Sequence, residues 1–414
     1  MPSSPAARPA APSRLLRGAR LATAALFFTN GALFSNLLPR YPAIKSGLDL
    51  THTQFGLVVI AFPIGAIVAG LGAAAAIRRF GAADVAVIGT VLTAVGLVVV
   101  GWAPALWLLI AALFVAGAAD SITDVGQNSH GIAVQRGYGR SIINSFHAVW
   151  SAGAVTGGLM GTAAAARDVP LGVHLTVSGV VWVTVAVVAR RFTLPPGMSV
   201  GPPLAVDRGP AGGPARAWLR RPGVFLAALV LIAMSGTMVE DAGNTWSAVF
   251  LSQELGAVPA LAGLGFVATV GAQFVGRVLG DPMTDRLGQR AVARIGALLI
   301  VTGMGVVVLG PGAGAVVGGF ALAGFGSATL VPAAMNAADD MPGMRAGTAL
   351  TIVSWLMRVA FVVSPPLVGA LGDAFGLRAG LAVVPVLAVG TLLLAGVLRG
   401  RPAAPASTGP SLGG

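Results

Sequence analysis

Long apolar runs separated by short polar connections follow one another along the whole chain. Twelve of these runs are long enough to cross a bilayer, since a spanning helix needs about 20 apolar residues. They are predicted at residues 21–40, 54–77, 83–101, 105–131, 142–166, 171–189, 224–251, 260–283, 291–310, 313–338, 347–371 and 377–398. The pattern therefore predicts an all-α polytopic membrane protein with twelve transmembrane helices.

The composition agrees with this class of protein. Only 10% of the residues are charged, where a soluble domain carries about 25%, and the mean hydropathy is +0.86. Glycine accounts for 59 of the 414 residues, as expected where helices approach closely in lipid. The chain has no cysteine, which excludes disulfides and thiolate metal sites.

The 26 arginine and lysine residues are unevenly shared between the two sides of the predicted spans. With a cytoplasmic N-terminus, twenty fall in inner loops and tails, two lie within spans (Arg277 and Arg358) and only four fall in outer loops, namely Arg40, Lys45, Arg167 and Arg378. This positive-inside bias predicts that both termini are cytoplasmic. Topology thus accounts for the net charge of +12, and nucleic acid is not an expected partner. We expect a multi-pass protein of the bacterial cytoplasmic (inner) membrane.

The longest hydrophilic stretch divides the chain into two sets of six spans, and its prolines and glycines cannot form a packed core. Sliding the sequence by 207 residues, half its length, aligns two corresponding corners: Arg79, Gly81, Val85, Ala86, Ile88 and Gly89 with Arg286, Gly288, Val292, Ala293, Ile295 and Gly296. This match indicates a duplicated six-helix unit. The expected organisation is a disordered cytoplasmic N-terminus (1–20), a six-helix bundle (21–190), a cytoplasmic linker (191–222), a second six-helix bundle (223–399) and a disordered cytoplasmic tail (400–414).

Motifs of two enzyme classes are missing. Lys45 is the only lysine and does not follow a glycine-rich phosphate loop, and neither Glu240 nor Glu254 belongs to an H-E-x-x-H motif. ATP hydrolysis and zinc proteolysis are excluded. We expect no enzyme activity, no cofactor and no metal site.

Short motifs resemble those of the major facilitator superfamily. The loop GDPMTDRLGQR at 280–290 is similar to its G-x3-[DN]-R-x-G-x-R motif, with Asp281 at the place of the first glycine. In the first half, Arg78 replaces the acidic residue of the equivalent loop. The segment 153–159 (GAVTGGL) resembles the GP-x2-GG element of the antiporters, with Ala154 in place of proline, and SFHAVWS (145–151) and GNTW (243–246) resemble a bacterial branch of the family. The resemblance implies two six-helix repeats and transport by alternating access.

Polar residues inside the spans are costly and are therefore functional candidates. Asp120, Asp124 and Asn128 form one stripe on the fourth span, and Asp120 lies about 16 Å from its predicted inner end at a rise of 1.5 Å per residue. Asn144 and His147 start the fifth span at a similar depth. A carboxyl group and an imidazole at one depth suit proton exchange, so Asp120, Asp124 and His147 are proton-coupling candidates. The alternative is a polar clasp between the two helices without titration.

The second half carries two further groups. Glu240, Asp241 and Asn244 lie on the seventh span, and a lone arginine in lipid needs a partner, so Arg358 is expected to pair with Glu240 or Asp241, or to meet an anionic substrate. With Asn30, Asn128 and Asn144, these are the substrate-cavity candidates. At the inner end of the eighth span we expect Arg277 to pair with Asp281, four residues along one face, in a gating group that is completed by Asp285 and Arg286.

Two sets of residues have simpler interpretations. Gly153, Gly157 and Gly161 are expected to let a neighbouring helix approach closely. The tryptophans near outer helix ends are expected to be interfacial anchors: Trp102, Trp107 and Trp246.

The sequence thus predicts a secondary carrier that moves a small organic molecule by alternating access, driven by a gradient. Proton-coupled efflux is the first hypothesis. Proton-coupled uptake of sugar-like solutes is the alternative, and a membrane receptor without transport is a third. The expected partners are the small-molecule substrate, protons and the lipid bilayer, and the expected state is a monomer.

Overall fold

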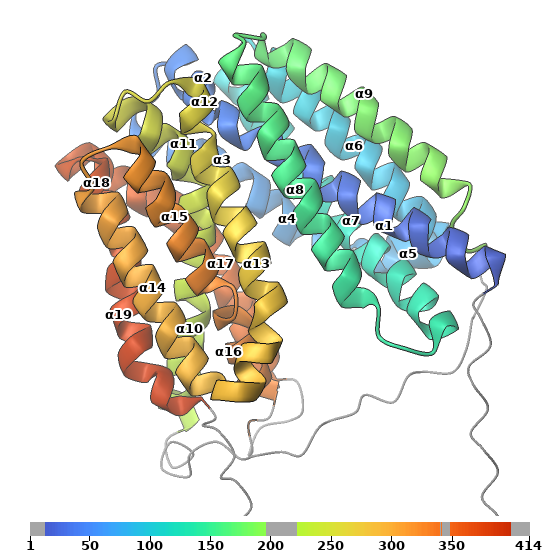
Figure 1. Ribbon diagram of the computed structural model, residues 1–414. Coiled ribbons are helices and arrows are strands. Elements are labelled where there is room, and N and C mark those ends of the chain that lie inside the picture. Colours follow the sequence, from blue (N-terminus) through green and yellow to red (C-terminus); the bar gives the residue numbers. More distant parts are fainter. Residues whose placement is uncertain (1–12, 196–221, 340, 342–347, 399–414) are drawn as a thin grey trace, which may run out of the picture. The chain divides into compact units, whose positions relative to one another are not determined.

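The computed structural model describes residues 13–195, 222–339, 341 and 348–398, and all regular structure in these residues is helical (Figure 1). The chain forms two compact units: unit 1 contains Met1–Leu37 and Ala61–Asp207, and unit 2 contains Leu38–Ile60 and Arg208–Gly414. Figure 1 shows each unit as a bundle of helices packed along their lengths.

The predicted spans correspond to helices. Within the described residues, 11 helical stretches are long and apolar enough to cross a membrane. The predicted fifth span is also a helix, α8 (Ile143–Ala166, 24 residues), although it is not one of these 11 stretches. The all-α membrane fold is therefore confirmed, and the helix count is consistent with twelve.

Unit 1 is built from α1 (Arg14–Ser35), α4 (Ala61–Gly70), α5 (Ala73–Phe80), α6 (Ala82–Trp102), α7 (Leu106–Tyr138), α8 and α9 (Leu171–Arg190). Its neighbouring pairs are α6 with α7, α1 with α8, α4 with α7, α6 with α9 and α1 with α9. Helix α1 begins at Arg14 because the Ser13 hydroxyl accepts a hydrogen bond from the backbone N–H of Leu16, at 3.3 Å. The chain is therefore already helical from residue 14, whereas disorder was expected up to residue 20; residues 1–12 lie outside the described part.

Small residues set the contact between α1 and α8, as the glycine pattern predicts. A Cβ atom on Gly153 would collide with the backbone of Phe28, and one on Gly157 with the backbone of Ala32. In the opposite direction, a Cβ on Gly31 would collide with the carbonyl oxygen of Trp150. The two backbones are therefore in direct contact, which fixes the polar side chains that α1 and α8 carry relative to each other.

Unit 2 consists of α2 (Tyr41–Gly47), α3 (His52–Val59), α10 (Pro222–Asp241), α11 (Ser247–Val249), α12 (Pro259–Ala262), α13 (Leu264–Leu287), α14 (Gln289–Leu309), α15 (Ala313–Ser327), α16 (Leu330–Asp339), α17 (Thr348–Phe375), α18 (Leu377–Leu381) and α19 (Val383–Leu394). Two short 3₁₀ helices, η1 (Leu38–Arg40) and η5 (Ala395–Val397), and two π-helical stretches, η3 (Ala242–Trp246) and η4 (Phe250–Glu254), complete it. The π-helical stretches flank α11, and π-helical turns are frequent at functional sites.

The boundary of the units differs from the expected one. Residues 38–60 belong by sequence to the first repeat but pack in unit 2, where α3 lies against α17. The contact is close because Gly56 has no side chain: a Cβ there would collide with the backbone of Pro365. The expected linker and tail lie mostly outside the described residues, but Leu194, at the start of that linker, is buried in the core of unit 1.

The internal repeat is visible at two equivalent corners. Gly81 ends α5 and precedes α6 with φ 85°, and Gly288 ends α13 and precedes α14 with φ 82°. Positive φ values of this size favour glycine. Each glycine also ends its helix with a backbone hydrogen bond of 2.8 Å: the N–H of Gly81 donates to the carbonyl oxygen of Ile77, and that of Gly288 donates to the carbonyl oxygen of Thr284. These corners are the ones that the sequence repeat aligns.

Candidate functional site

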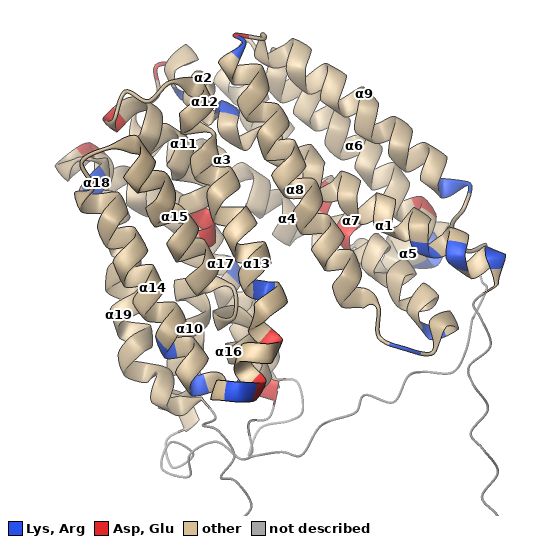
Figure 2. Cartoon of the chain, in the orientation of Figure 1, with Lys and Arg blue, Asp and Glu red and all other residues tan. Residues whose placement is uncertain are grey.

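Charged side chains of both units lie mostly near helix ends, and only a few lie midway along the helices (Figure 2). In unit 1, the midway group is a polar cluster on α1, α7 and α8. It is defined by Asn30, Asp120, Asp124, Gln127, Asn128 and Trp150, and we call it the Asn30 cluster. Four of its members were predicted proton or substrate candidates that the fold brings together: Asn30, Asp120, Asp124 and Asn128.

Asn30 is the centre of this cluster. Its Nδ2 donates to Asp120 Oδ1 at 2.7 Å, and its Oδ1 accepts from Trp150 Nε1 at 2.8 Å. A carboxylate accepts and an indole only donates, so these two partners fix the orientation of the amide. Gln127 Nε2 adds a third contact to Asn30 Oδ1 at 3.3 Å. Asn30 is 7% exposed, so the cluster is anchored inside the unit.

The two acids of the stripe differ in their surroundings. Asp120 is half-buried, whereas Asp124, one turn further along α7, is exposed. Asp124 Oδ1 accepts from Asn128 Nδ2 at 3.0 Å and from Gln127 Nε2 at 3.4 Å. The arrangement places one carboxyl group inside the unit and a second at its surface, joined through neutral amides.

The two candidates at the start of α8 are placed less deeply than the Asn30 cluster. Asn144 and His147 are both exposed. The His147 ring meets Phe27 edge to face, with the centroids 5.3 Å apart. Phe27 itself stacks on Phe146 in the core of the unit at 5.4 Å. His147 therefore lies on α8, about one turn before Trp150. Its ring contacts α1, the helix that carries Asn30.

A second buried acid lies in unit 2. Asp241, at the end of α10, is 3% exposed. Its Oδ1 accepts from Thr245 Oγ1 at 2.9 Å, and its Oδ2 accepts from Ser364 Oγ of α17 at 2.6 Å. Ser364 is 1% exposed. Two neutral hydroxyl groups, and no arginine among the described residues, thus hold this carboxyl group.

The ion pairs of unit 2 differ from the expected ones. Arg277 lies closest to Glu240, with 3.7 Å between Nη2 and Oε2, and does not pair with Asp281. Glu240 also accepts from Gln273 Nε2 at 3.1 Å. The expected pair along α13 was wrong because Glu240 of α10 faces the same side of α13 as Arg277 and Gln273. Asp281, Asp285 and Arg286 are exposed at the end of α13 and make no ion pair with a described residue.

The expected pairing of Arg358 was also wrong. Arg358 is exposed on α17, and no carboxylate of the described residues forms an ion pair with it. Both of its predicted partners have other contacts, Asp241 with hydroxyl groups and Glu240 with Arg277. Asn244 lies in the π-helical stretch η3, half-buried, between these acids and Trp246 in the sequence.

Trp246 is a core residue and not an interfacial anchor. It is fully buried and meets Phe55 of α3 edge to face at 5.6 Å, and the His52 ring lies 6.2 Å away. In contrast, Trp102 and Trp107 are 60% and 71% exposed, as an anchor requires. Trp246 is buried because residues 38–60 pack in unit 2, which the hydropathy pattern does not reveal.

Asp373 of α17 caps the N-terminus of α3. Its Oδ1 accepts from the backbone N–H of His52 at 2.8 Å, and its Oδ2 accepts from that of Thr53 at 2.9 Å. A carboxylate at a helix N-terminus is favoured by the free N–H groups and by the helix dipole. These two hydrogen bonds join residues that are 321 and 320 positions apart in the sequence, and they hold α3 on α17.

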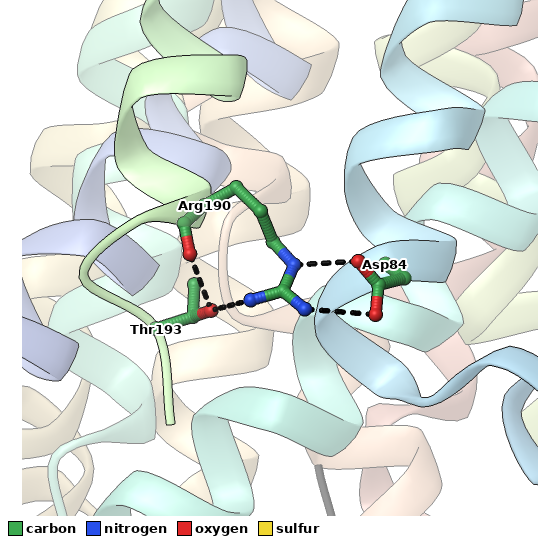
Figure 3. A network of polar contacts seen from close by, with 3 residues as sticks. All are labelled: Asp84, Arg190 and Thr193. Carbon is green, nitrogen blue, oxygen red and sulfur yellow. Dashed lines mark hydrogen bonds and ion pairs between the residues drawn. The ribbon is translucent and has the colours of Figure 1, made fainter. Parts of the chain in front are cut away.

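An ion pair between two helix ends lies at one end of unit 1 (Figure 3). Arg190 of α9 donates to both carboxylate oxygens of Asp84 of α6, from Nε to Oδ1 at 2.6 Å and from Nη2 to Oδ2 at 2.8 Å. Its Nη1 donates to Thr193 Oγ1 at 3.0 Å, and that hydroxyl donates back to the Arg190 carbonyl oxygen. The bidentate geometry suits a structural clamp between two helix ends.

Several of these residues were not found from the sequence: Gln127, Thr245, Gln273, Ser364 and Asp373. Four are neutral or small polar residues, which are common in membrane helices for packing reasons and carry no periodic signal of their own. Gln127 and Gln273 each lie within one turn of a predicted candidate, at i+3 from Asp124 and i−4 from Arg277. A search for amides on the same helix face would have found these two.

A polytopic helical chain with an internal repeat is the architecture of many membrane carriers. Residues 230–414 match the model of the Major Facilitator Superfamily. The chain is 31% identical over 381 residues to the uncharacterized transporter y4wD of Sinorhizobium fredii, a match that covers 91% of this chain and 97% of that protein. It is 28% identical over 376 residues to an uncharacterized MFS-type transporter of Yersinia pestis, covering 89% and 92%.

A solved structure shows the same fold. A bacterial homolog of the human lysosomal transporter Spinster superposes with a TM-score of 0.71 at 15% identity, covering 93% of this chain and 97% of that one. The chain belongs to the Major Facilitator Superfamily and is a membrane transporter, not an enzyme. A small-molecule substrate and a lipid bilayer follow from this assignment.

Proposed function

We propose that the protein is a proton-coupled carrier that exports a small organic molecule from the cytoplasm. The observation that carries the proposal is the Asn30 cluster, in which Asp120 and Asp124 stand one turn apart at different exposure. A proton that reaches exposed Asp124 has a second acceptor further inside. Because Asp120 accepts its hydrogen bond from the neutral amide of Asn30, the cluster can hold either protonation state of that carboxyl group.

The other candidates have supporting roles in this proposal. His147, exposed at the start of α8, is a second group that could pass protons at this end of the unit. Arg358 has no acidic partner among the described residues, so it is available in unit 2 for an anionic part of the substrate. Asn128, Asn144, Asn244, Glu240 and Asp241 are the remaining proposed substrate contacts.

The direction of transport is proposed from α8. Its glycine-rich element resembles that of antiporters, and its glycines are packed on the backbone of α1. Uptake of sugar-like solutes by proton symport is the second candidate. It is favoured by the Trp150 indole, which lies beside Asn30 at 2.8 Å, since an aromatic face suits a polyol.

The gating group is proposed to regulate access at the predicted cytoplasmic end of α13. Arg277 connects this group to Glu240, and Asp281, Asp285 and Arg286 continue it to the end of α13. The protein is further proposed to reside in the bacterial inner membrane as a monomer, with both termini in the cytoplasm.

Paired transport measurements test the proton proposal. A thermal-stability screen of small organic compounds first finds a ligand, which stabilises the folded carrier by mass action. Proteoliposomes then report two quantities: accumulation of the labelled ligand driven by a pH gradient, and its exchange without a gradient. Asp120→Asn or Asp124→Asn should abolish the first and preserve the second.

A matched control separates this effect from a general loss of charge. Asp168 of unit 1 is exposed between α8 and α9 with φ 51°, a conformation that asparagine also tolerates. Asp168→Asn should accumulate ligand like the parent. If both stripe variants also accumulate ligand like the parent, the Asn30 cluster is a polar clasp and proton coupling through it is wrong.

A further inference from the structure

An apolar groove runs along the outside of unit 1 between α1 and α9. It has a volume of about 470 Å³ and is lined by Gly18, Leu21, Ala22, Ala25, Thr184, Val185, Val188, Ala189 and Phe192. We call it the α1–α9 groove. The single hydroxyl in it, on Thr184, already donates to the Val180 carbonyl oxygen at 2.7 Å. The groove therefore offers only apolar surface along its length.

The groove exists because α1 presents small residues where α9 presents larger ones. Gly18, Ala22 and Ala25 follow each other at helical spacing on α1 and leave the space unfilled. Nothing in unit 1 covers it in the described residues: Leu21 is 73% exposed and Phe192 is 59% exposed. A groove of this volume lies within the range of about 300–1,000 Å³ for ligand pockets. In a membrane protein its natural occupant is an acyl chain.

Arginines surround one end of the groove. Arg14 lies one turn before Gly18 on the same face of α1, Arg17 lies at the edge of that face, and Arg191 directly precedes Phe192. All three are exposed, and none forms an ion pair with a described acid. Their free guanidinium groups can therefore bind an anion.

Neighbouring arginines have other partners, which makes this trio distinct. Arg190 is held by Asp84 in the clamp of Figure 3. Arg20 lies over the Tyr138 ring, 5.4 Å from its centroid. The positive charge left at the mouth of the groove is thus concentrated in Arg14, Arg17 and Arg191.

We propose that the α1–α9 groove binds one anionic phospholipid, with an acyl chain against Gly18, Ala22 and Val188 and the phosphate among Arg14, Arg17 and Arg191. Basic residues between membrane helices on the cytoplasmic side bind anionic headgroups in this manner. The chain's own segments outside the described residues have a less suitable charge. Residues 196–221 carry four arginines and one aspartate, and residues 1–12 carry one arginine and no acid, so both would be repelled by the trio.

Two variants test the two halves of the site separately. Gly18→Leu fills the groove, and it should fold because a Cβ at Gly18 has no atom nearer than 3.9 Å. The triple change of Arg14, Arg17 and Arg191 to Gln removes the charges but leaves the groove. The matched controls are Gly305→Leu, at a glycine of α14 whose Cβ meets nothing within 4 Å, and a triple Gln change of three exposed arginines elsewhere in unit 1, Arg78, Arg136 and Arg140.

The full-length protein is purified from bilayers of phosphatidylglycerol and phosphatidylethanolamine, and native mass spectrometry counts the lipids that stay bound. The parent and both controls should retain one phosphatidylglycerol in preference to phosphatidylethanolamine. Both site variants should lose this preference, with a fall of about tenfold or more in apparent affinity, as expected from removing several arginines at an anionic surface. Equal retention of both lipids by the parent would overturn the proposal, as would parent-like retention of phosphatidylglycerol by Gly18→Leu.

Discussion

The contact between Asp241 and Ser364 joins α10 to α17 in the interior of unit 2, and its strength can be predicted from the structure. The Ser364 hydroxyl donates to Asp241 Oδ2 at 2.6 Å, and both side chains are almost completely buried. Ser364→Ala removes the donor and leaves Oδ2 with no other donor among the described residues. The carboxyl group cannot turn to solvent, because it is 3% exposed.

Two ranges bound the expected loss of stability. A hydrogen bond to a charged group contributes about 1.5–3 kcal/mol in soluble proteins. Polar contacts between membrane helices average about 0.6 kcal/mol and reach about 1.7 kcal/mol. The short distance and deep burial place this contact at the upper end of the membrane range. We therefore expect Ser364→Ala to lower the free energy of unfolding by about 1.5 kcal/mol.

Reversible unfolding in mixed micelles, followed by tryptophan fluorescence, measures this loss. Ser327→Ala is the control, because that serine is also buried in unit 2 but donates to the carbonyl oxygen of Gly324 on its own helix, at 2.9 Å. A double-mutant cycle with Asp241→Asn isolates the pair. A loss from Ser364→Ala no larger than that of the control, together with a coupling energy near zero, would refute the assigned contact.

Three further predictions concern the ends of the helices. Arg190→Gln should lower the free energy of unfolding by about 1 kcal/mol in the same assay, the upper end for a partly exposed pair, and a change indistinguishable from zero would contradict the clamp. Asp373→Ala removes the cap of α3, worth about 0.5–2 kcal/mol, and should speed thiol labelling of a cysteine at buried Val58; an unchanged rate would show that α3 is held by packing alone. For topology, single cysteines at Ser141 and Gln253, both exposed, should differ in intact cells, with only the second reacting with an impermeant reagent; labelling of the first from outside would reverse the orientation.

The sequence was sufficient for those features that depend on periodicity. The apolar runs gave the helices, the repeat gave the equivalent corners at Gly81 and Gly288, and the helical spacing gave the stripe of Asp120 and Asp124. In each case the sequence pattern lies within a single helix or occurs in both halves of the chain. The close approach of a neighbouring helix to the glycines of α8 also followed from their spacing at every fourth position, whereas the structure identifies that helix as α1.

The choice of partners for charged residues could not be predicted in the same way. The spacing along α13 predicted Asp281 as the partner of Arg277, but in the folded unit Arg277 lies closest to Glu240 of α10. Similarly, the hydropathy of residues 38–60 does not show that they pack on α17, so Trp246 was expected at the interface with lipid and is instead fully buried. Both errors arise because contacts between helices depend on rotation about the helix axis, which periodicity alone leaves undetermined.

The partners of the acids decide which of them can take part in proton exchange. Arg190 binds both oxygens of Asp84, and this bidentate pair is suited to a fixed clamp. Asp120 instead meets the amide of Asn30, a neutral group whose contact can persist when the carboxyl group gains a proton on its other oxygen. The proton-coupling proposal therefore rests on Asp120 and not on Asp84, although both are acids of unit 1 on predicted spans.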